Sequence, residues 1–416
     1  MKFETITNEN LRAGQCAAPN CVPGRPSTGY SLVPAVCRTA ALAVALALPA
    51  AAAFPNGYSY CKLVTISASM VSGSVDLSNF PLTVSLTDSD LKTVPNGGLV
   101  NSASAHDVGF YPDCSGSGTA LKWEIESYSP TTGALVAHVL RPVLSHTVND
   151  TIGMYYGAAF STLQTTPVNV WDSGYAAVWH MALNGSTAAD STANANTGTV
   201  MGTVSSATGK LDGAVSSSTY GINAIRVNDA ASLRVTGGKL TISAWIYQSF
   251  RNPNGSIVLQ KRIATTDNPI EYGFFLDPAG VPSFQFYNFG YHNFYDTSSI
   301  PLNTWTNVTI TVDEAAATKL RFYRNGVQNS APSYSSNMLS GTNPLQLTNF
   351  DQFYGGVFPV NGIVDELRIS NVARSADWIL TEYRNQNAPG TYLSLGPRAT
   401  AGAPTVRVRH SVGGGE

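Results

Sequence analysis

The sequence predicts an all-β protein in which a small antiparallel β-sandwich is followed by a larger two-sheet jelly roll. Charged residues make up 12% of the 416 residues, half of the ~25% usual for soluble domains. Glycine (37 residues) and proline (23 residues) are abundant. Short segments that alternate between polar and apolar residues, or are rich in β-branched residues, recur between turn residues along most of the chain. This composition and this spacing favour sheets over helices.

Residues 39–53 form the one strongly apolar run, which predicts export rather than a membrane span. The run is shorter than the ~20 apolar residues of a spanning helix, Arg38 precedes it, and residues 51–53 are the small residues of a secretory cleavage site. We therefore expect residues 1–53 to be a leader with a signal peptide. The mature chain, without a stable membrane span, would be secreted, periplasmic or held at the cell surface by bacterial-type export. A transmembrane anchor is the alternative.

Residues 54–162 contain about seven short strands, a spacing typical of an antiparallel sandwich. The segment "LKWEIESY" alternates, so that Glu124 and Glu126 share one face, which we expect to be solvated. Cys61 and Cys114 are the two cysteines outside the leader, and an even pair in an exported protein predicts a disulfide. Two buried free thiols are the alternative, and two sulfurs without clustered histidines do not indicate a metal site.

A short polar linker, residues 163–174, leads to a second domain over residues 175–396. The many short strands of this domain suit a large two-sheet jelly roll. The convincing helix covers residues 375–386, with Ser375 as its N-cap residue. Residues 397–416 are rich in small residues, and we expect them to form a disordered tail.

Both halves resemble known families. Residues 58–160 resemble a bacterial domain of unknown function, numbered 2341 among such families, in the segments "FPLTVSL", "HDVGFY", "LKWEIESY" and "DTIGMYYG". Residues 175–396 resemble the laminin-G-like, concanavalin A-like lectin/glucanase jelly rolls in the segments "AVWHM", "ADSTANANTGT", "LTISAWI", "NTWTNVTITVD", "LRFYRNGV" and "GIVDELRISNVARSADWI". The second resemblance implies a concanavalin A-like two-sheet fold. It leaves function open, because these jelly rolls host lectins, adhesion modules and enzymes.

The sequence contains no catalytic motif. Glycosidases need two carboxylates ~5–10 Å apart, and jelly-roll glucanases that resemble this fold carry an E-x-D-x-x-E strand, of which "EIESYS" keeps only the first residue. Asp365 and Glu366 are adjacent, so that on a regular strand they point to opposite faces. No two histidines have the spacing of a zinc motif, and there is no G-x-S-x-G segment. We therefore expect no enzymatic activity.

The resemblance also implies a structural calcium ion, the best candidate for a cofactor. Similar jelly rolls often bind Ca²⁺ near a loop that here contains Asp190 and Asn194, together with a late aspartate that here is Asp365. Side-chain and carbonyl oxygens would supply the ~6–8 oxygen ligands that Ca²⁺ prefers. Asp190 and Asn194 also suit simple Asx-turns, which need no metal ion. The sequence leaves both alternatives open.

The aromatic segment "SFQFYNFGYHNFYD" is the candidate ligand-binding surface. Phe284 and Phe286 alternate with Gln285, and we expect both phenylalanines in the core together with Phe294. Further aromatic rings lie near the predicted turn at Gly290, where they would be placed to stack on a sugar. These rings belong to Tyr287, Phe289, Tyr291 and Tyr295. Ordinary packing is the alternative for all four.

These observations predict a secreted, non-catalytic binding or adhesion protein that recognises an extracellular glycan or a cell-surface protein through its lectin-like jelly roll. The net charge of −2 offers no electrostatic field for nucleic acid. One alternative is a glycan-active enzyme on the jelly-roll fold, either a glycoside hydrolase or a lyase. A structural cell-surface protein is the other alternative.

Overall fold

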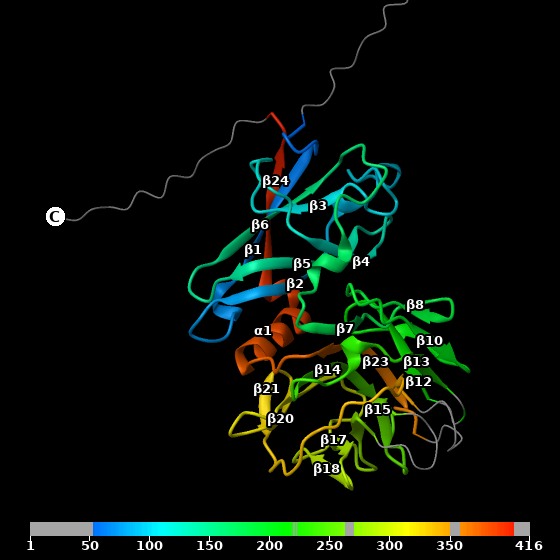
Figure 1. The fold of residues 1–416 in the computed structure, drawn as a ribbon. Coiled ribbons are helices and arrows are strands. Elements are labelled where there is room, and N and C mark those ends of the chain that lie inside the picture. Colours follow the sequence, from blue (N-terminus) through cyan, green and yellow to red (C-terminus); the bar gives the residue numbers. More distant parts are fainter. Residues whose placement is uncertain (1–52, 219–220, 222, 263–269, 350–357, 403–416) are drawn as a thin grey trace, which may run out of the picture. The chain divides into compact units, whose positions relative to one another are not determined.

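Antiparallel β-sheets form most of the described chain (Figure 1). The computed structural model describes residues 53–402 apart from residues 219–220, 222, 263–269 and 350–357, and the predicted leader lies almost entirely outside this range. The predicted all-β fold class is confirmed. Within the described ranges, no helix has the length and the apolar character that crossing a membrane requires.

The first β-sandwich consists of a four-stranded sheet with the order β24-β1-β6-β3 and a three-stranded sheet with the order β2-β5-β4. The strands are β1 (Tyr60–Ile66), β2 (Leu77–Thr87), β3 (Val108–Tyr111), β4 (Trp123–Tyr128), β5 (Ala134–Leu144), β6 (Asp150–Tyr156) and β24 (Leu393–Thr400). Apolar side chains from both sheets share one core, in which Val64 of β1, Leu82 of β2 and Trp123 of β4 are fully buried. Alternation along each strand therefore turns one face of each sheet inward.

The last strand of the chain completes this first sandwich. The sequence assigns residues 397–416 to a disordered tail, but β24 pairs with β1 from Thr400 opposite Tyr60 to Leu393 opposite Ile66. Residues 397–400 are thus part of a sheet. The physical reason is that β1 has an unpaired edge until another strand covers it.

Cys61 and Cys114 form the predicted disulfide, with their Cα atoms 5.7 Å apart. Cys61 lies on β1 and Cys114 in the loop that follows β3. Cys61 is buried in a small cluster with Tyr58 and Tyr155. The disulfide therefore attaches the partly buried loop residue Cys114 to a buried position of the sheet.

The second sandwich is a jelly roll of two larger sheets. One sheet has the order β18-β17-β16-β15-β22-β13-β10-β9-β8, and the other has the order β11-β12-β23-β14-β19-β20-β21 with β7 paired to β23. The strands of the first of these sheets are β8 (Leu183–Asn184), β9 (Thr187–Ala188), β10 (Gly198–Met201), β13 (Ala224–Val227), β15 (Ser256–Lys261), β16 (Tyr272–Leu276), β17 (Pro282–Tyr287), β18 (Tyr291–Tyr295) and β22 (Leu345–Leu347). Those of the second are β7 (Tyr175–Trp179), β11 (Ser205–Thr208), β12 (Gly213–Ser217), β14 (Lys239–Gln248), β19 (Thr306–Asp313), β20 (Leu320–Arg324), β21 (Val327–Ser330) and β23 (Gly362–Ser370). The inner faces of the two sheets share one core, to which Ile242, Phe284 and Ile310 contribute.

A helix connects the two sandwiches. The helices are α1 (Ala376–Asn387) and α2 (Pro389–Tyr392), and short 3₁₀ turns cover Ala68–Met70, Ser89–Leu91, Val94–Asn96, Pro167–Val170 and Ala231–Leu233. The predicted N-cap residue, Ser375, accepts a backbone N–H from the first turn of α1. Near the end of α1, the amide of Asn385 accepts from the Thr83 N–H (2.7 Å) and donates to the Thr83 carbonyl (2.8 Å). The next residue, Gln386, accepts from the indole N–H of Trp245 (2.6 Å). Hydrogen bonds to β2 and β14 thus hold α1 in place. Figure 1 shows this helix between the two sandwiches.

Candidate functional site

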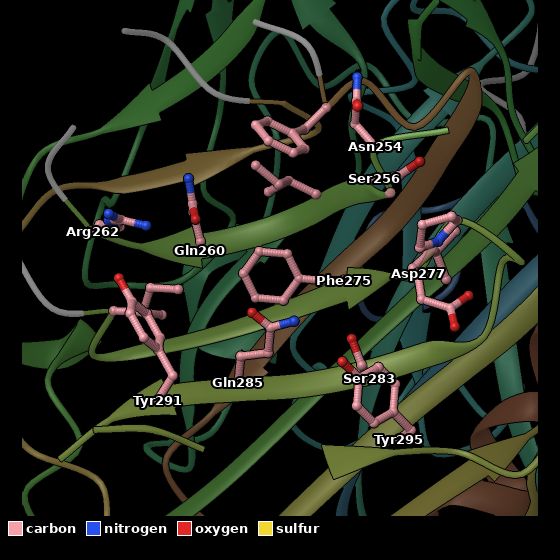
Figure 2. Close-up of a pocket in the computed structure, with 16 residues that line it drawn as sticks. Asn254, Ser256, Gln260, Arg262, Phe275, Asp277, Ser283, Gln285, Tyr291 and Tyr295 are labelled. Carbon is pink, nitrogen blue, oxygen red and sulfur yellow. The ribbon is translucent and has the colours of Figure 1, made fainter. Parts of the chain in front are cut away.

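A groove of about 310 Å³ lies on the outer face of the nine-stranded sheet, over β15 to β18 (Figure 2). Strand alternation places its lining residues there. On β17, Phe284 and Phe286 are buried in the core of the jelly roll, and Ser283 and Gln285 face the groove. The core and the groove are therefore built from alternate residues of the same strands.

The groove combines apolar and polar side chains. Phe275 of β16 packs with Ile257 and Phe358 in a small apolar cluster, and all three line the groove. Polar and aromatic side chains surround this cluster, namely Asn254, Ser256, Gln260, Arg262, Asp277, Ser283, Gln285, Tyr291 and Tyr295. Such a lining offers an apolar surface to one part of a ligand and hydrogen-bonding groups to another.

Three buried polar atoms at the groove have no hydrogen-bond partner among the described residues. They are the hydroxyl oxygens of Ser256 and Ser283 and the Nε of Arg262. A buried polar group without a partner costs about 1–3 kcal/mol of stability, and such groups in folded proteins call for a physical explanation. A polar ligand in the groove would supply the missing partners.

Two of the four predicted aromatic residues line the groove. Tyr291 and Tyr295 lie on β18 with 56% and 47% of their surface exposed, and both line it. Tyr287 packs edge-on against Tyr291 at a centroid distance of 5.3 Å, but it does not line the groove itself. Phe289 is 99% exposed at the tip of the hairpin, where its φ is 52°. The four predicted aromatic residues therefore do not form one surface. Tyr291 and Tyr295 line the groove, whereas Tyr287 and Phe289 do not.

The core residues of the aromatic segment are placed as predicted. Phe284 and Phe286 are fully buried, and Phe294 is 7% exposed. Gln260, Arg262 and the other groove residues near β15 and β16 were not predicted from the sequence. Alternation along a strand predicts which face such a side chain occupies, but it does not predict which strands pair. The pairings of β15 with β16, β16 with β17 and β17 with β18 place these residues on the same face as Tyr291.

The predicted metal ligand Asp190 is engaged within its own loop. One carboxylate oxygen accepts the N–H groups of Val178 and Thr192, both at 2.9 Å. The other accepts the Asn196 N–H (2.7 Å) and the Thr192 hydroxyl (2.9 Å). These contacts are those of a carboxylate that closes a loop.

The other two predicted metal ligands have different partners. The amide nitrogen of Asn194 donates to the carbonyls of Tyr175 and Ala176, at 3.2 and 3.0 Å. Asp365 accepts the N–H groups of Lys210 (2.7 Å) and Leu211 (3.1 Å) in a separate turn. Calcium binding by Asp190, Asn194 and Asp365 stays a prediction.

The variant Asp190→Ala tests the role of this loop. We expect it to lower the free energy of unfolding by about 1–3 kcal/mol, because three buried N–H groups lose their acceptor. Differential scanning calorimetry with and without added Ca²⁺, after chelator treatment, gives the measurement. A melting temperature of the wild-type protein that rises with Ca²⁺ supports the calcium ion, and one that does not change supports loop closure alone.

Residues 219–380 match a family model described as the concanavalin A-like lectin/glucanases superfamily. This match supports the resemblance predicted for the C-terminal half over these residues. The resemblance of residues 58–160 to the bacterial domain of unknown function stays a prediction. No curated protein matches the chain.

Several solved structures are similar to part of the chain. The binding domain of paraclostridial mosquitocidal protein 1 has a TM-score of 0.41 and 15% identity, and the match covers 50% of this chain and 52% of that one. Domain 4 of the extracellular arabinanase AbnA from Geobacillus stearothermophilus, solved with arabinotriose, has a TM-score of 0.40 and 21% identity over 50% of this chain and 98% of that one. A Trypanosoma rangeli sialidase has a TM-score of 0.41 and 11% identity over 61% of this chain and 43% of that one. The match thus spans about half of the mosquitocidal binding domain, and similarities at this level say nothing about function.

Proposed function

We propose that this protein is a non-catalytic, glycan-binding protein of the cell exterior and that the groove over β15 to β18 is its binding site. The observation that carries the proposal is the composition of the groove. Tyr291 and Tyr295 line the groove together with two hydroxyl groups and one guanidinium Nε that have no hydrogen-bond partner among the described residues. Sugars present apolar C–H faces together with hydroxyl groups, so aromatic rings and unpaired hydrogen-bonding groups match both parts of a glycan.

The charged residues of the groove favour binding over hydrolysis. Asp277 is the one carboxylate among the described lining residues, and one of its oxygens accepts the Val281 N–H at 2.8 Å. Glycoside hydrolysis generally needs two carboxylates on opposite sides of the bond. Since the described lining supplies one, we propose recognition of the glycan without its cleavage.

The disulfide is consistent with a location outside the cytoplasm, because disulfides persist in oxidising compartments. We propose export through the predicted leader, with the mature chain starting near Phe54. Mass spectrometry of material collected from the producing cells would give the N-terminus. Secreted protein that retains residues 39–53 would contradict the proposed cleavage.

A glycan array probed with the full chain tests the proposed function. For a glycan that binds, we expect Tyr291→Ala and Gln285→Ala each to weaken the affinity at least tenfold, which corresponds to about 1.4 kcal/mol. Isothermal titration calorimetry measures this change. Phe289→Ala is the matched control, because Phe289 belongs to the same hairpin but does not line the groove.

Three results would contradict the proposal. The first is an array on which no glycan binds the folded protein. The second is an equal loss of affinity in Phe289→Ala and Tyr291→Ala, which would place the site at the hairpin tip rather than in the groove. Release of reducing ends from a polysaccharide by the purified wild-type protein would indicate an enzyme instead.

A further inference from the structure

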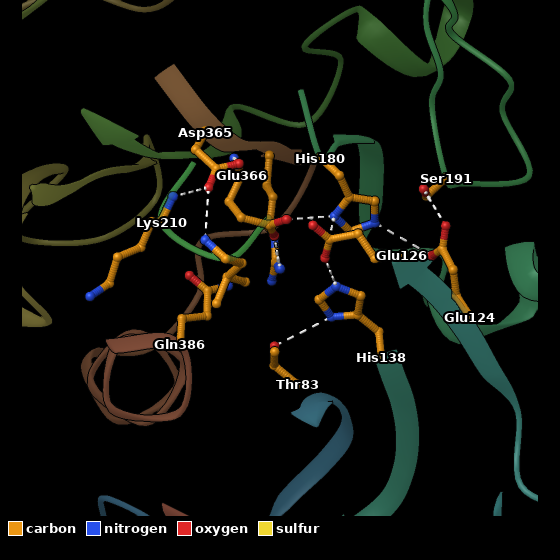
Figure 3. A network of polar contacts seen from close by, with 12 residues as sticks. Thr83, Glu124, Glu126, His138, His180, Ser191, Lys210, Asp365, Glu366 and Gln386 are labelled. Atoms are coloured by element: carbon orange, nitrogen blue, oxygen red, sulfur yellow. Dashed lines mark hydrogen bonds and ion pairs between the residues drawn. The ribbon is translucent and has the colours of Figure 1, made fainter. Parts of the chain in front are cut away.

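A cluster of two histidines and two glutamates is buried where the first sandwich meets the jelly roll (Figure 3). Glu126 comes from β4 and His138 from β5 of the first sandwich, whereas His180 directly follows β7 and Glu366 lies on β23 of the jelly roll. One nitrogen or oxygen atom from each residue lies within 4.8 Å of the corresponding atom of the other three. We call these four residues the Glu–His cluster.

The donor atoms of the Glu–His cluster face one another. Nε2 of His138 lies 2.8 Å from Oε2 of Glu126, and Nδ1 of His180 lies 2.5 Å from Oε1 of Glu366. Nδ1 of His180 is also 3.5 Å from Oε2 of Glu126, which connects the two pairs. The two imidazole rings are nearly parallel, with centroids 4.7 Å apart. Two nitrogens and two carboxylate oxygens thus converge on one small volume.

Polar groups lie near the other nitrogen of each imidazole ring. Nδ1 of His138, which points away from Glu126, lies 3.3 Å from the Thr83 hydroxyl. Nε2 of His180 is 3.5 Å from a carboxylate oxygen of Glu124 and has no hydrogen-bond partner among the described residues. Histidines that bind a metal ion generally pair their other ring nitrogen with a carboxylate or another polar group, which fixes the ring and its tautomer.

The two carboxylates that belong to the cluster are held in a similar way. The guanidinium group of Arg368 donates to Oε2 of Glu366 and leaves Oε1 directed at His180. Oε1 of Glu126 is buried and accepts no hydrogen bond from the described residues, and the Glu126 side chain is 1% exposed. A buried carboxylate oxygen without a donor is costly, and a bound cation would remove that cost.

Both glutamates of the cluster stand where a strand is irregular. The pairing of β4 with β5 shifts register between Ile125 and Ser127, which makes Glu126 the additional residue. The pairing of β14 with β23 shifts register between Ser243, which pairs with Arg368, and Trp245, which pairs with Asp365. Glu366 lies within this irregular part of β23 and has a φ of 50°. A β-bulge redirects a side chain and is common beside functional sites. A left-handed conformation at a buried glutamate also carries strain.

The cluster and its neighbours are rich in carboxylates. The buried carboxylates of Glu124, Glu126 and Glu366 each lie within 3.5 Å of His180. The guanidinium group of Arg368 pairs with Glu366. A divalent cation would add positive charge among these carboxylates.

We propose that Glu126, His138, His180 and Glu366 together bind one divalent transition-metal ion, for which Zn²⁺ is the best match, and that this ion joins the two β-sandwiches. Four protein ligands in a closed, buried site are typical of structural zinc, which accepts imidazole nitrogen and carboxylate oxygen. Calcium and magnesium prefer ligand sets made of oxygen. Each sandwich supplies one histidine and one glutamate, so the ion would stabilise the contact between the sandwiches.

Two features hide this site in the sequence. Alternation predicts a solvated face for Glu124 and Glu126, and that prediction is wrong, because the jelly roll covers this face and their side chains are 13% and 1% exposed. The two histidines are also far apart in the sequence, and His138 and His180 meet only through the contact between the sandwiches.

The test uses the full chain, stripped of metal with a chelator and then titrated with Zn²⁺. We expect one equivalent to bind, as measured by elemental analysis after gel filtration, and the melting temperature to rise. The double variant His138→Gln/His180→Gln should lose both responses. The matched control, His106→Gln/His146→Gln, changes two other histidines of the first sandwich and should bind Zn²⁺ as the wild-type protein does.

A variant outside the four ligands distinguishes a metal site from a simple buried ion-pair network. We expect Glu124→Gln to keep the stoichiometry of one and to weaken Zn²⁺ affinity by about 10- to 100-fold, because Glu124 is not one of the four ligands but its carboxylate lies beside Nε2 of His180. Co²⁺ in place of Zn²⁺ should give a visible absorption spectrum that the double histidine variant lacks. If that double variant does not fold, Glu126→Gln and the wild-type titration provide the same comparison.

The proposal is overturned if stripped wild-type protein binds no stoichiometric Zn²⁺ and its melting temperature does not respond. It is also overturned if the control variant His106→Gln/His146→Gln loses Zn²⁺ binding to the same extent as His138→Gln/His180→Gln. Binding of Ca²⁺ but not Zn²⁺ to the cluster would contradict the assigned class of metal. None of these results depends on the proposed binding of glycans.

Discussion

Replacing Phe286 with alanine is expected to lower the free energy of unfolding by about 3–5 kcal/mol, as truncation of a buried phenylalanine does. Phe286 is fully buried in the core of the jelly roll. Its ring stacks with His292 at 5.0 Å and with Phe294 at 5.9 Å, and it packs against Tyr334 at 5.4 Å. Removal of the ring would leave a cavity that these neighbours cannot fill without moving. Urea unfolding followed by fluorescence gives the measurement.

Tyr291→Ala is the matched comparison, because Tyr291 lies on the neighbouring strand of the same hairpin with 56% of its surface exposed. We expect its free energy of unfolding to stay within about 1 kcal/mol of the wild-type value, since exposed positions contribute little to stability. The two variants thus separate the core from the groove. Equal destabilisation by Tyr291→Ala and Phe286→Ala would show that Tyr291 is a packing residue and would remove it from the proposed glycan site.

Loss of the Cys61–Cys114 disulfide is expected to be the other large effect. The two residues are 53 positions apart in the sequence, and closing a loop of this length contributes about 4 kcal/mol in the chain-entropy model. The double variant Cys61→Ala/Cys114→Ala removes the link without placing a polar group at the buried Cys61 position. We expect its unfolding midpoint in urea to fall accordingly.

Reductant provides the control for this experiment. It should destabilise the wild-type protein and leave the double cysteine variant unchanged, because the variant has no disulfide to reduce at these positions. Non-reducing peptide mapping should recover Cys61 and Cys114 in one linked fragment. Recovery of both as free thiols from exported protein would contradict the disulfide.

Local patterns in the sequence were sufficient for much of the fold. Alternation in "SFQFYN" places Phe284 and Phe286 in the core and Gln285 on the opposite face, because side chains on a strand alternate regardless of which strands lie beside it. Ser375 marks the start of α1 for an equally local reason, since a hydroxyl that caps a helix acts within one turn. Cys61 and Cys114 could be paired because they were the two cysteines outside the predicted leader.

The sites depended on contacts that no local pattern encodes. The groove exists because β15 and β16 lie beside β17 and β18, which places Gln260 and Phe275 near Tyr291. The predicted tail residues 397–400 join β1 through a pairing that spans almost the whole described chain. Strand periodicity specifies which face a side chain occupies, but it does not specify which strand becomes its neighbour.

The Glu–His cluster shows most clearly the difference between what local patterns predict and what depends on tertiary contacts. Regular alternation predicted that Glu124 and Glu126 would face solvent. The structure instead has bulges near Glu126 and Glu366, and the jelly roll covers the face of the first sandwich that carries His138. Most strands, the core phenylalanines, the helix start and the disulfide could be predicted from the sequence, because each follows from short-range geometry or from counting. The groove and the cluster could not, because strand partners, bulges and the contact between two sandwiches result from the free energy of packing the whole chain.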